Sequence, residues 1–284
     1  DDHYVANIDG NHVDHVLSQL PPAQTLVVIV SKTFTTLETC TNAETVRSWL
    51  AQAMPGANLA QHFIAVSTNL SVAGEFGVKS ENVLPLWDFV GGRYSLWSAV
   101  GLTLAIIHGF EVFERLLDGA RAMDKHFASA APETNLPLTA ALLSVWYNNF
   151  FGAQSHAVVP YDHFLRLLPA HLQQLDMESL GKSVNKAGVP VTTDTGQIIW
   201  GGEGSNGQHA FHQLLHQGTR LVPVDFILPL RARHHLPEHH EWLVANCLGQ
   251  AEALMLGLSA DDLRKSGAGD SEVAHRTHVG NRPS

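Results

Sequence analysis

The fold of this chain is decided by the stretch Leu26-Val27-Val28-Ile29-Val30-Ser31-Lys32-Thr33-Phe34-Thr35-Thr36. Its first five residues form a continuous, mainly β-branched run, which is typical of a strand buried on both faces of a parallel sheet. A hydroxyl-rich segment follows, and then a predicted helix that ends near Met54. Thr35 and Glu38 fit a capping box at the start of that helix. The stretch therefore predicts a strand followed by a helix, the repeating unit of an α/β fold.

The same alternation of strands and helices continues along the chain. Further strands are predicted at 4–7, 62–67, 83–87, 157–160, 197–200 and within 221–230. We expect an α/β protein with mainly parallel sheets: a first domain at 1–105, a helical connection at 106–150 and a second domain at 151–284. The uncharged run 94–110 is predicted to be a buried helix, and the tail from Ser266 a loop.

Composition excludes several classes of protein. The 284 residues are 45% hydrophobic and 15% charged, which indicates a soluble globular chain with a large core. A formal net charge of −10 argues against a general nucleic-acid binder, although one local basic cluster would suffice for a phosphorylated small substrate. The run 94–110 is shorter than the roughly 20 apolar residues that a membrane span needs. No membrane or nucleic-acid partner is therefore predicted.

The cysteines indicate the cellular compartment, and the first residues indicate whether the sequence is complete. Cys40 and Cys247 are too few and too far apart in sequence for a disulfide framework, so the cytoplasm is the expected compartment. The sequence starts at Asp1 without Met, immediately before an apolar segment. We expect it to be an excerpt of a longer protein.

Two segments of the first domain could bind a ligand. The hydroxyls and the ammonium of 31–36 stand at a helix start, where backbone N–H groups attract anions, although the hydroxyls could serve only as caps. After the strand at 83–87 come Asp88, the pair Gly91-Gly92 and Arg93. The glycines permit backbone conformations closed to other residues and let a ligand approach the backbone closely, and Arg93 stands between a strand and a helix. The alternative is a turn with a solvated arginine.

A glycine loop in the second domain allows two interpretations. Residues 202–207 match G-x-G-x-x-G after a strand and before a helix, and Asp225 lies 18 residues past Gly207. Taken literally, this pattern predicts NAD binding and a nucleotide-dependent oxidoreductase. The preceding strand is short, however, and the loop lies well inside the chain. The other interpretation places His209 at a helix start, where the dipole favours a neutral imidazole.

One carboxylate and one histidine cluster complete the candidates. Glu178 lies near the end of a predicted helix, where it could act as a general base or be a surface acid. The histidines of 234–240 match no zinc spacing, and Pro237 interrupts any shared helical face. No metal site is predicted.

Together these stretches resemble the glucose-6-phosphate isomerase family, of the bacterial and animal type. The resemblance covers residues 4–283 and rests on five segments in order: 31–36, 88–101, Gln174-x-x-x-Glu178, 206–211 and 280–283. It implies two sugar-isomerase (SIS) domains, each with three αβα layers, in a homodimer that needs no cofactor. It also implies interconversion of glucose 6-phosphate and fructose 6-phosphate through a cis-enediol.

The resemblance implies a role for each candidate residue. Glu178 would move the proton between C1 and C2, Arg93 would stabilise the developing charge, and His209 of the partner subunit would assist ring opening. The residues that would bind the sugar phosphate are Ser31, Lys32, Thr33 and Thr36, with Gly92 and Gln174 lining the sugar.

This sequence also departs from the family pattern. Leu175 and Leu180 stand where the family usually has Gly and Asn, which could alter the local turn. The family's phosphate loop and catalytic lysine would lie before Asp1 and after Ser284. We therefore expect isomerase activity from a longer polypeptide, and at most non-catalytic sugar-phosphate binding from these 284 residues alone.

Overall fold

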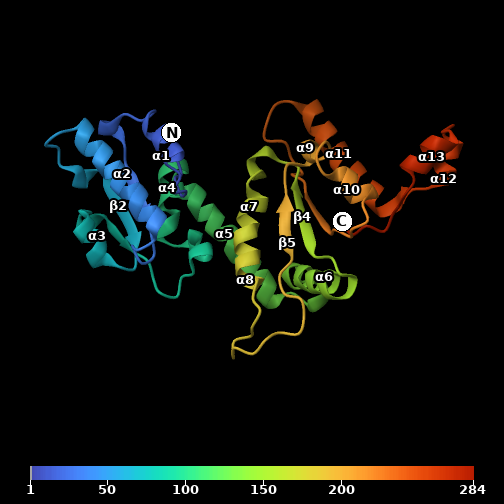
Figure 1. Cartoon of the computed structure of the whole chain (residues 1–284), viewed down its shortest axis with the longest axis horizontal. Coiled ribbons are helices and arrows are strands. Elements are labelled where there is room, and N and C mark those ends of the chain that lie inside the picture. The colour runs from blue at the N-terminus through green and yellow to red at the C-terminus, as the bar shows by residue number, and fades with distance from the viewer. Residues whose placement is uncertain (1) are drawn as a thin grey trace. The chain divides into compact units, whose positions relative to one another are not determined.

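The computed structural model describes residues 2–284 and divides the chain into two compact units, Asp1–Ala128 and Ser129–Ser284. Each unit contains its own parallel sheet with helices packed against it (Figure 1). Helix α5, Phe110–Ser129, leads from the first unit to the second along the chain. An α/β fold with mainly parallel sheets is therefore confirmed.

The sheet of the first unit has the strand order β1-β2-β3, with all pairs parallel. Ile29 pairs with Ala65, and Val66 with Leu84, so the β-branched run that opens the sequence argument is one edge of the sheet. Phe34 joins the core beside the ring of Phe76. The main elements are α1 (Gly10–Leu17), β1 (Val27–Val30), α2 (Leu37–Ala53), β2 (Phe63–Ser67), α3 (Leu70–Phe76), β3 (Val83–Pro85) and α4 (Leu102–His108).

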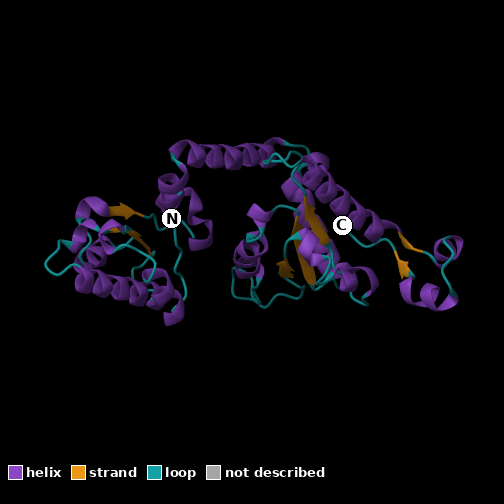
Figure 2. Ribbon diagram, turned by 90° about the horizontal axis from the view of Figure 1, so that it is seen from above, coloured by secondary structure: helices purple, strands orange, loops and turns teal. Residues whose placement is uncertain are grey.

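The sheet of the second unit has the order β5-β4-β6, again parallel. The central strand β4 is the most buried, and its Val158 pairs with Gly201 on one side and Asp225 on the other. Figure 2 shows helices on both sides of these strands. The elements as far as β6 are α6 (Leu136–Phe151), β4 (Ser155–Pro160), α7 (Leu168–Leu172), a π-helix η8 (Gln173–Met177), α8 (Glu178–Leu180), β5 (Ile198–Gly201), α9 (Gly204–Gly207), α10 (His212–Gln217) and β6 (Val224–Ile227).

A long helix and a small hairpin end the second unit. Helix α11, Pro237–Leu256, is followed by α12 (Ala260–Lys265) and α13 (Asp270–Arg276), which lie between the antiparallel strands β7 (Gly257–Leu258) and β8 (His278–Val279). The prediction of a loop from Ser266 is therefore wrong for 270–279, because α13 ends in a strand that pairs with β7.

Most strand predictions are confirmed, and one is wrong. Strands β2, β3 and β6 fall within the predicted ranges 62–67, 83–87 and 221–230, while β4 starts two residues before its range 157–160 and β5 ends one residue after its range 197–200. Residues 4–7, which are part of the described chain, form no strand. The carbonyl of Asn7 accepts a hydrogen bond from the amide of Asn42 on α2, so helix contacts hold this segment in place of sheet pairing.

The prediction of one buried helix over 94–110 is also wrong. The run is divided into the 3₁₀ helices η4, Gly92–Trp97, and η5, Ala99–Gly101, before α4 begins. Ser98 has an extended backbone and donates its hydroxyl to the carbonyl of Ser95, which interrupts helical bonding. Ile106 on α4 is 53% exposed. Over residues 2–284, no helix combines the length and the apolar character needed to cross a membrane.

Candidate active site

The segment 31–36 is anchored by its own backbone to the neighbouring strand. The carbonyl of Lys32 accepts hydrogen bonds from the Thr68 amide at 2.8 Å and hydroxyl at 2.6 Å, and from the Ser67 hydroxyl at 3.0 Å. Ser31 is buried, with its Oγ 3.5 Å from Oγ1 of Thr36. The segment therefore leaves β1 in a defined direction.

Phe34 turns this segment so that its hydroxyls face outward. Its φ of 57° lies in the left-handed region, where a bulky residue carries a strain of about 1–3 kcal/mol. The Phe34 side chain is buried, with its ring centroid 5.8 Å from that of Phe76. Thr33 and Thr35 are exposed, and their hydroxyl oxygens are 2.6 Å apart. Burial of Phe34 thus compensates for the strain and presents two hydroxyls to solvent.

The start of α2 lacks the capping bond that the sequence predicts. Thr36 is the N-cap and makes no side-chain bond to the helix start, and Thr35 bonds to Thr33. The predicted capping box with Glu38 is therefore wrong. Helix-start N–H groups without a side-chain acceptor remain suited to an anion, and this disfavours the interpretation that the hydroxyls serve only as caps.

Lys32 connects this segment to the turn before Arg93. Its ammonium donates to the carbonyls of Asp88 at 2.7 Å and Val90 at 3.1 Å, more than 50 residues further along the chain. Gly92 starts η4, and a Cβ added there would meet nothing within 4 Å. The guanidinium of Arg93 lies 5.3 Å from the ring centroid of Tyr94. In the first unit, one turn thus carries an unobstructed backbone position at Gly92 and the side chain of Arg93, and the Lys32 ammonium is bonded to this turn.

One of the two expected reasons for the glycine pair, a backbone conformation closed to other residues, is wrong. Gly91 has φ −72° and ψ 143°, an ordinary extended conformation, and neither glycine has positive φ. What distinguishes Gly92 is the open space beside its backbone, which a ligand could approach closely.

In the second unit, Glu178 follows a turn of π-helix that the sequence does not reveal. The turn spans Gln173–Met177, and its first side chain donates to the carbonyl of Ile199 on β5 at 3.0 Å. Gln174 and Glu178 are exposed, about one helical turn apart. Short π-helical segments are frequent at functional sites. The backbone carbonyl of Glu178 accepts a hydrogen bond from the Lys182 ammonium.

The two departures from the family pattern have different surroundings. Leu175 is half-buried within the π-helix. Leu180 is 48% exposed and packs beside Gly196, where an added Cβ would lie 3.1 Å from the Leu180 Cβ. Both are accommodated without displacing Glu178 from the helix.

A carboxylate within the π-helix, Asp176, was not identified from the sequence. Burial raises the pKa of Asp176 above 3.8, and the nearby His156 opposes this shift. His156 Nε2 lies 2.9 Å from Oδ2 of Asp225. Only the folding of η8 against the strands brings Asp176 near His156, so no local sequence signal could have identified it.

The glycine loop is explained by packing and does not have the geometry of a nucleotide site. A Cβ on Gly204 would come within 2.1 Å of the Tyr161 ring, and one on Gly207 within 2.5 Å of the Phe211 ring. Asp225 lies on β6, which is separated from β5 by β4 and so is not adjacent to the strand that precedes the loop. A dinucleotide site needs a free ribose acid at the carboxyl end of a neighbouring strand.

His209 lies in the turn between α9 and α10 and is exposed. The expectation that it stands at a helix start is wrong, because α10 begins three residues later at His212. His212 is buried, and this burial lowers its pKa. The His209 amide bonds to the carbonyl of Asn206 at 3.1 Å, while the Gln208 side chain donates to the Tyr161 hydroxyl at 3.1 Å. The turn is therefore held by one backbone bond and one side-chain bond next to the imidazole.

One further pair fastens the glycine loop to the central strand. His163 follows β4, and its Nδ1 lies 2.7 Å from a carboxylate oxygen of Glu203 in the loop. Sequence reasoning missed this pair, since the two residues are 40 positions apart. Among residues 2–284, no group of three or more His, Cys, Asp or Glu side chains is placed to hold a metal ion.

Comparison with known proteins identifies the family. The family model of phosphoglucose isomerase matches residues 1–284. The glucose-6-phosphate isomerase of Pseudomonas fluorescens is 55% identical over 291 residues, which cover 99% of this chain and 52% of that protein. The corresponding protein of Chlorobium luteolum is 56% identical over 290 residues, covering 99% and 53%.

A solved structure agrees with these relatives. The crystal structure of a glucose-6-phosphate isomerase from Chlamydia trachomatis has a TM-score of 0.86 and 38% identity, covering 99% of this chain and 53% of that one. The chain spans about half the length of the curated relatives it matches. On this evidence the chain belongs to the phosphoglucose isomerase family.

Proposed function

We propose that this chain is part of an enzyme that interconverts glucose 6-phosphate and fructose 6-phosphate through a cis-enediol, without a cofactor. The observation that carries the proposal is the contact of Lys32 with the turn before Arg93, beside the open start of α2. A phosphorylated sugar needs a cation and N–H donors to bind its phosphate. It needs a second cation to stabilise the negative charge that develops on a sugar oxygen during proton transfer. Membership of a family whose relatives are named glucose-6-phosphate isomerase supports this substrate.

The first unit would bind the substrate phosphate. Helix-start N–H groups, exposed hydroxyls and an ammonium are strong donors to phosphate oxygens. Gly92 would lie against the sugar through its open backbone, and Gln174 would contribute its exposed amide. The residues assigned to the phosphate are Ser31, Lys32, Thr33 and Thr36.

Glu178 would transfer the proton. In the open-chain aldose it would take the proton from C2, so that a double bond forms between C1 and C2 and the carbonyl oxygen on C1 gains negative charge. Arg93 would stabilise that charge electrostatically. Return of the same proton to C1, with transfer of the hydroxyl proton from O2 to the charged O1, makes C2 the carbonyl carbon and gives the ketose. His209 would donate a proton to the ring oxygen during ring opening.

We further propose that the enzyme is a cytoplasmic homodimer in which His209 acts in the partner subunit's site. Its exposed position on a held turn supports this assignment. Cys40 and Cys247 are both free thiols, as a reducing compartment would require.

The test is a coupled assay on a protein of the relatives' full length that contains this chain. Glu178→Gln should lower kcat by about 10²–10⁴-fold, the usual contribution of a general base. Glu241→Gln, which removes an exposed acid from α11, is the matched control and should turn over normally. Normal turnover by Glu178→Gln would contradict the assigned base.

The 284 residues alone would bind sugar phosphate without turnover, because they span only half of the relatives' length. Saturable binding of 6-phosphogluconate, lost in Lys32→Ala, would support this. Turnover by the isolated chain would show that no further residues are needed for catalysis.

A further inference from the structure

Helix α6 uses its polar side chains to pack against its own unit. The Ser144 hydroxyl bonds to the Gln197 side chain at 3.0 Å, and the amide of Asn148 donates to the Thr195 carbonyl at 2.8 Å. Asn149 exchanges two hydrogen bonds with the backbone of Asp194, at 3.2 and 3.0 Å. The face of α6 that contacts segment 194–197 is therefore a polar face.

The face of α6 that points away from segment 194–197 carries exposed apolar side chains. Leu142, Trp146 and Phe150 follow at four-residue spacing and are 61%, 55% and 74% exposed. The rings of Trp146 and Phe150 lie 5.6 Å apart, and α6 contains no charged residue. A surface helix normally turns its apolar side chains inward and its polar ones to water. Helix α6 reverses this order, as the core of an interface would.

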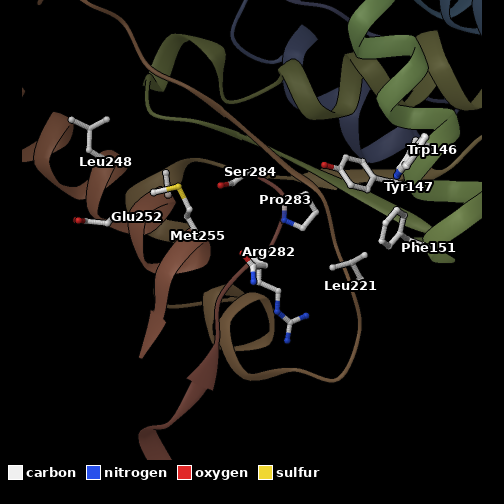
Figure 3. A pocket seen from close by; sticks show the side chains of 12 residues that line it. Trp146, Tyr147, Phe151, Leu221, Leu248, Glu252, Met255, Arg282, Pro283 and Ser284 are labelled. Carbon is white, nitrogen blue, oxygen red and sulfur yellow. The ribbon is translucent and has the colours of Figure 1, made fainter. Parts of the chain in front are cut away.

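A groove continues this apolar face (Figure 3). It encloses about 860 Å³ between α6, α11 and residues 281–284. Leu248 and Met255 on α11 are 59% and 57% exposed. Two charged residues line it: Arg282 donates its guanidinium to the carbonyls of Gly218 and Arg220, and Glu252 is exposed.

A segment of the chain itself already forms one wall of this groove. The Asn281 amide donates to the carbonyl of Met255 at 2.8 Å, and the Pro283 carbonyl accepts from the Val224 amide at 3.0 Å. Extended polypeptide, held by backbone bonds, is thus a suitable neighbour for α11 and the edge strand β6.

The exposed area is large enough for a permanent interface. The chain exposes 18381 Å². Two separate folded domains of these sizes would expose about 14,400 Å². The excess of about 4,000 Å² is distributed over the whole chain, and burial of even part of it would suffice for a stable interface, to which each partner contributes about 800 Å².

We propose that the α6–α11 face, defined by Leu142, Trp146, Phe150, Leu248 and Met255, is covered by the part of the longer polypeptide that this chain lacks. The relatives are about twice as long as the chain, so a comparable length of polypeptide is available to cover it. The occupant is an apolar segment of the same molecule, because the five residues that define the face are apolar and a segment of the same chain already lines the adjoining groove. This inference does not depend on the proposed reaction.

The test uses a protein of the relatives' full length with p-benzoylphenylalanine in place of Phe150, and in a control in place of Arg264, which is exposed on α12. Irradiation should cross-link position 150 at monomer mass to a peptide outside these 284 residues, with at least five-fold higher yield than position 264. A product of twice the mass would show that a second copy covers the face. A cross-link within the 284 residues, or a yield equal to the control, would also overturn the proposal.

A second measurement does not depend on the photoprobe. Iodoacetamide should label Leu142→Cys at least ten-fold more slowly than Arg264→Cys in the folded longer protein, with unfolded protein as the common reference. Equal labelling rates would show an open face and overturn the proposal.

Discussion

Lys32 donates its ammonium protons to the carbonyl of Asp88 at 2.7 Å, so a side chain at the end of β1 holds the turn that leads to Arg93. The same lysine bonds to Val90 at 3.1 Å. A phosphate bound at the start of α2 would compete with these carbonyls for the ammonium. The lysine is therefore both a support for the turn and a candidate ligand for phosphate.

Lys32→Met should affect stability and substrate binding together. Removal of two charge-assisted bonds is expected to lower the free energy of unfolding of the first unit by about 1–3 kcal/mol. In the longer protein KM for the sugar phosphate should rise at least ten-fold. Urea unfolding and steady-state kinetics measure the two effects. Lys79→Met, at a partly exposed lysine whose ammonium lies 3.9 Å from the Glu81 carboxylate, is the control and should change neither quantity appreciably.

Arg93→Ala should lower kcat more than it raises KM, since the proposed charge develops only in the transition state. Arg93→Lys should restore part of kcat, because it keeps a positive charge but loses the planar fork. Steady-state kinetics on the longer protein separate the two parameters. A change in KM alone would make Arg93 a substrate binder and contradict the electrostatic role.

Gln173→Ala should loosen the turn that carries Glu178. The loss of the bond to Ile199 is expected to cost about 1 kcal/mol in stability and to lower kcat while KM changes little. Gln174→Ala is the matched neighbour, and as a proposed sugar contact it should act mainly on KM. If Gln173→Ala leaves kcat unchanged, the π-helical turn has no positioning role.

Gly204→Ala should destabilise the second unit, because the new methyl would lie 2.1 Å from a ring atom of Tyr161. Overpacking of this kind costs about 1–3 kcal/mol. Gly249→Ala on α11 is the control: its Cβ meets nothing within 4 Å, and a gain of about 0.5–1 kcal/mol is expected in a helix interior. Denaturant unfolding compares the two. Equal effects would refute the packing explanation of the glycine loop.

His212 should make the second unit sensitive to acid. Burial lowers its pKa from the ordinary value of 6.5, so the unfolded chain binds this proton more readily than the folded one. Stability from the neutral imidazole is full above pH 6.5 and falls as pH drops from there through the lower pKa of the folded state. His212→Phe, next to the Phe211 ring, should remove this dependence. The free energy of unfolding is measured from pH 5 to 8 for the unsubstituted protein and for His212→Phe. If it changes with pH equally in both proteins, His212 is not the source of the acid sensitivity.

Local patterns in the sequence were enough to determine the elements and most of the candidate residues. The β-branched run 27–30 forms a strand because such side chains fit a sheet buried on both faces, whatever lies further along the chain. The break of 94–110 was not predictable in the same way, since it depends on one hydroxyl bond at Ser98. The capping box failed for a similar reason: Thr35 had a competing partner in Thr33.

What the sequence by itself determined is therefore an α/β chain of the phosphoglucose isomerase family, because periodicity and motifs are properties of neighbouring residues. Only the tertiary structure decided which distant groups meet. The bonds of Lys32 to the turn at Asp88, the anchoring of the π-helix by Ile199 and the packing of Gly204 on Tyr161 all join segments more than 25 residues apart. The outward apolar face of α6 likewise became visible only when its polar face was found bonded to segment 194–197. Such contacts depend on how the sheets and helices pack, which no local pattern specifies.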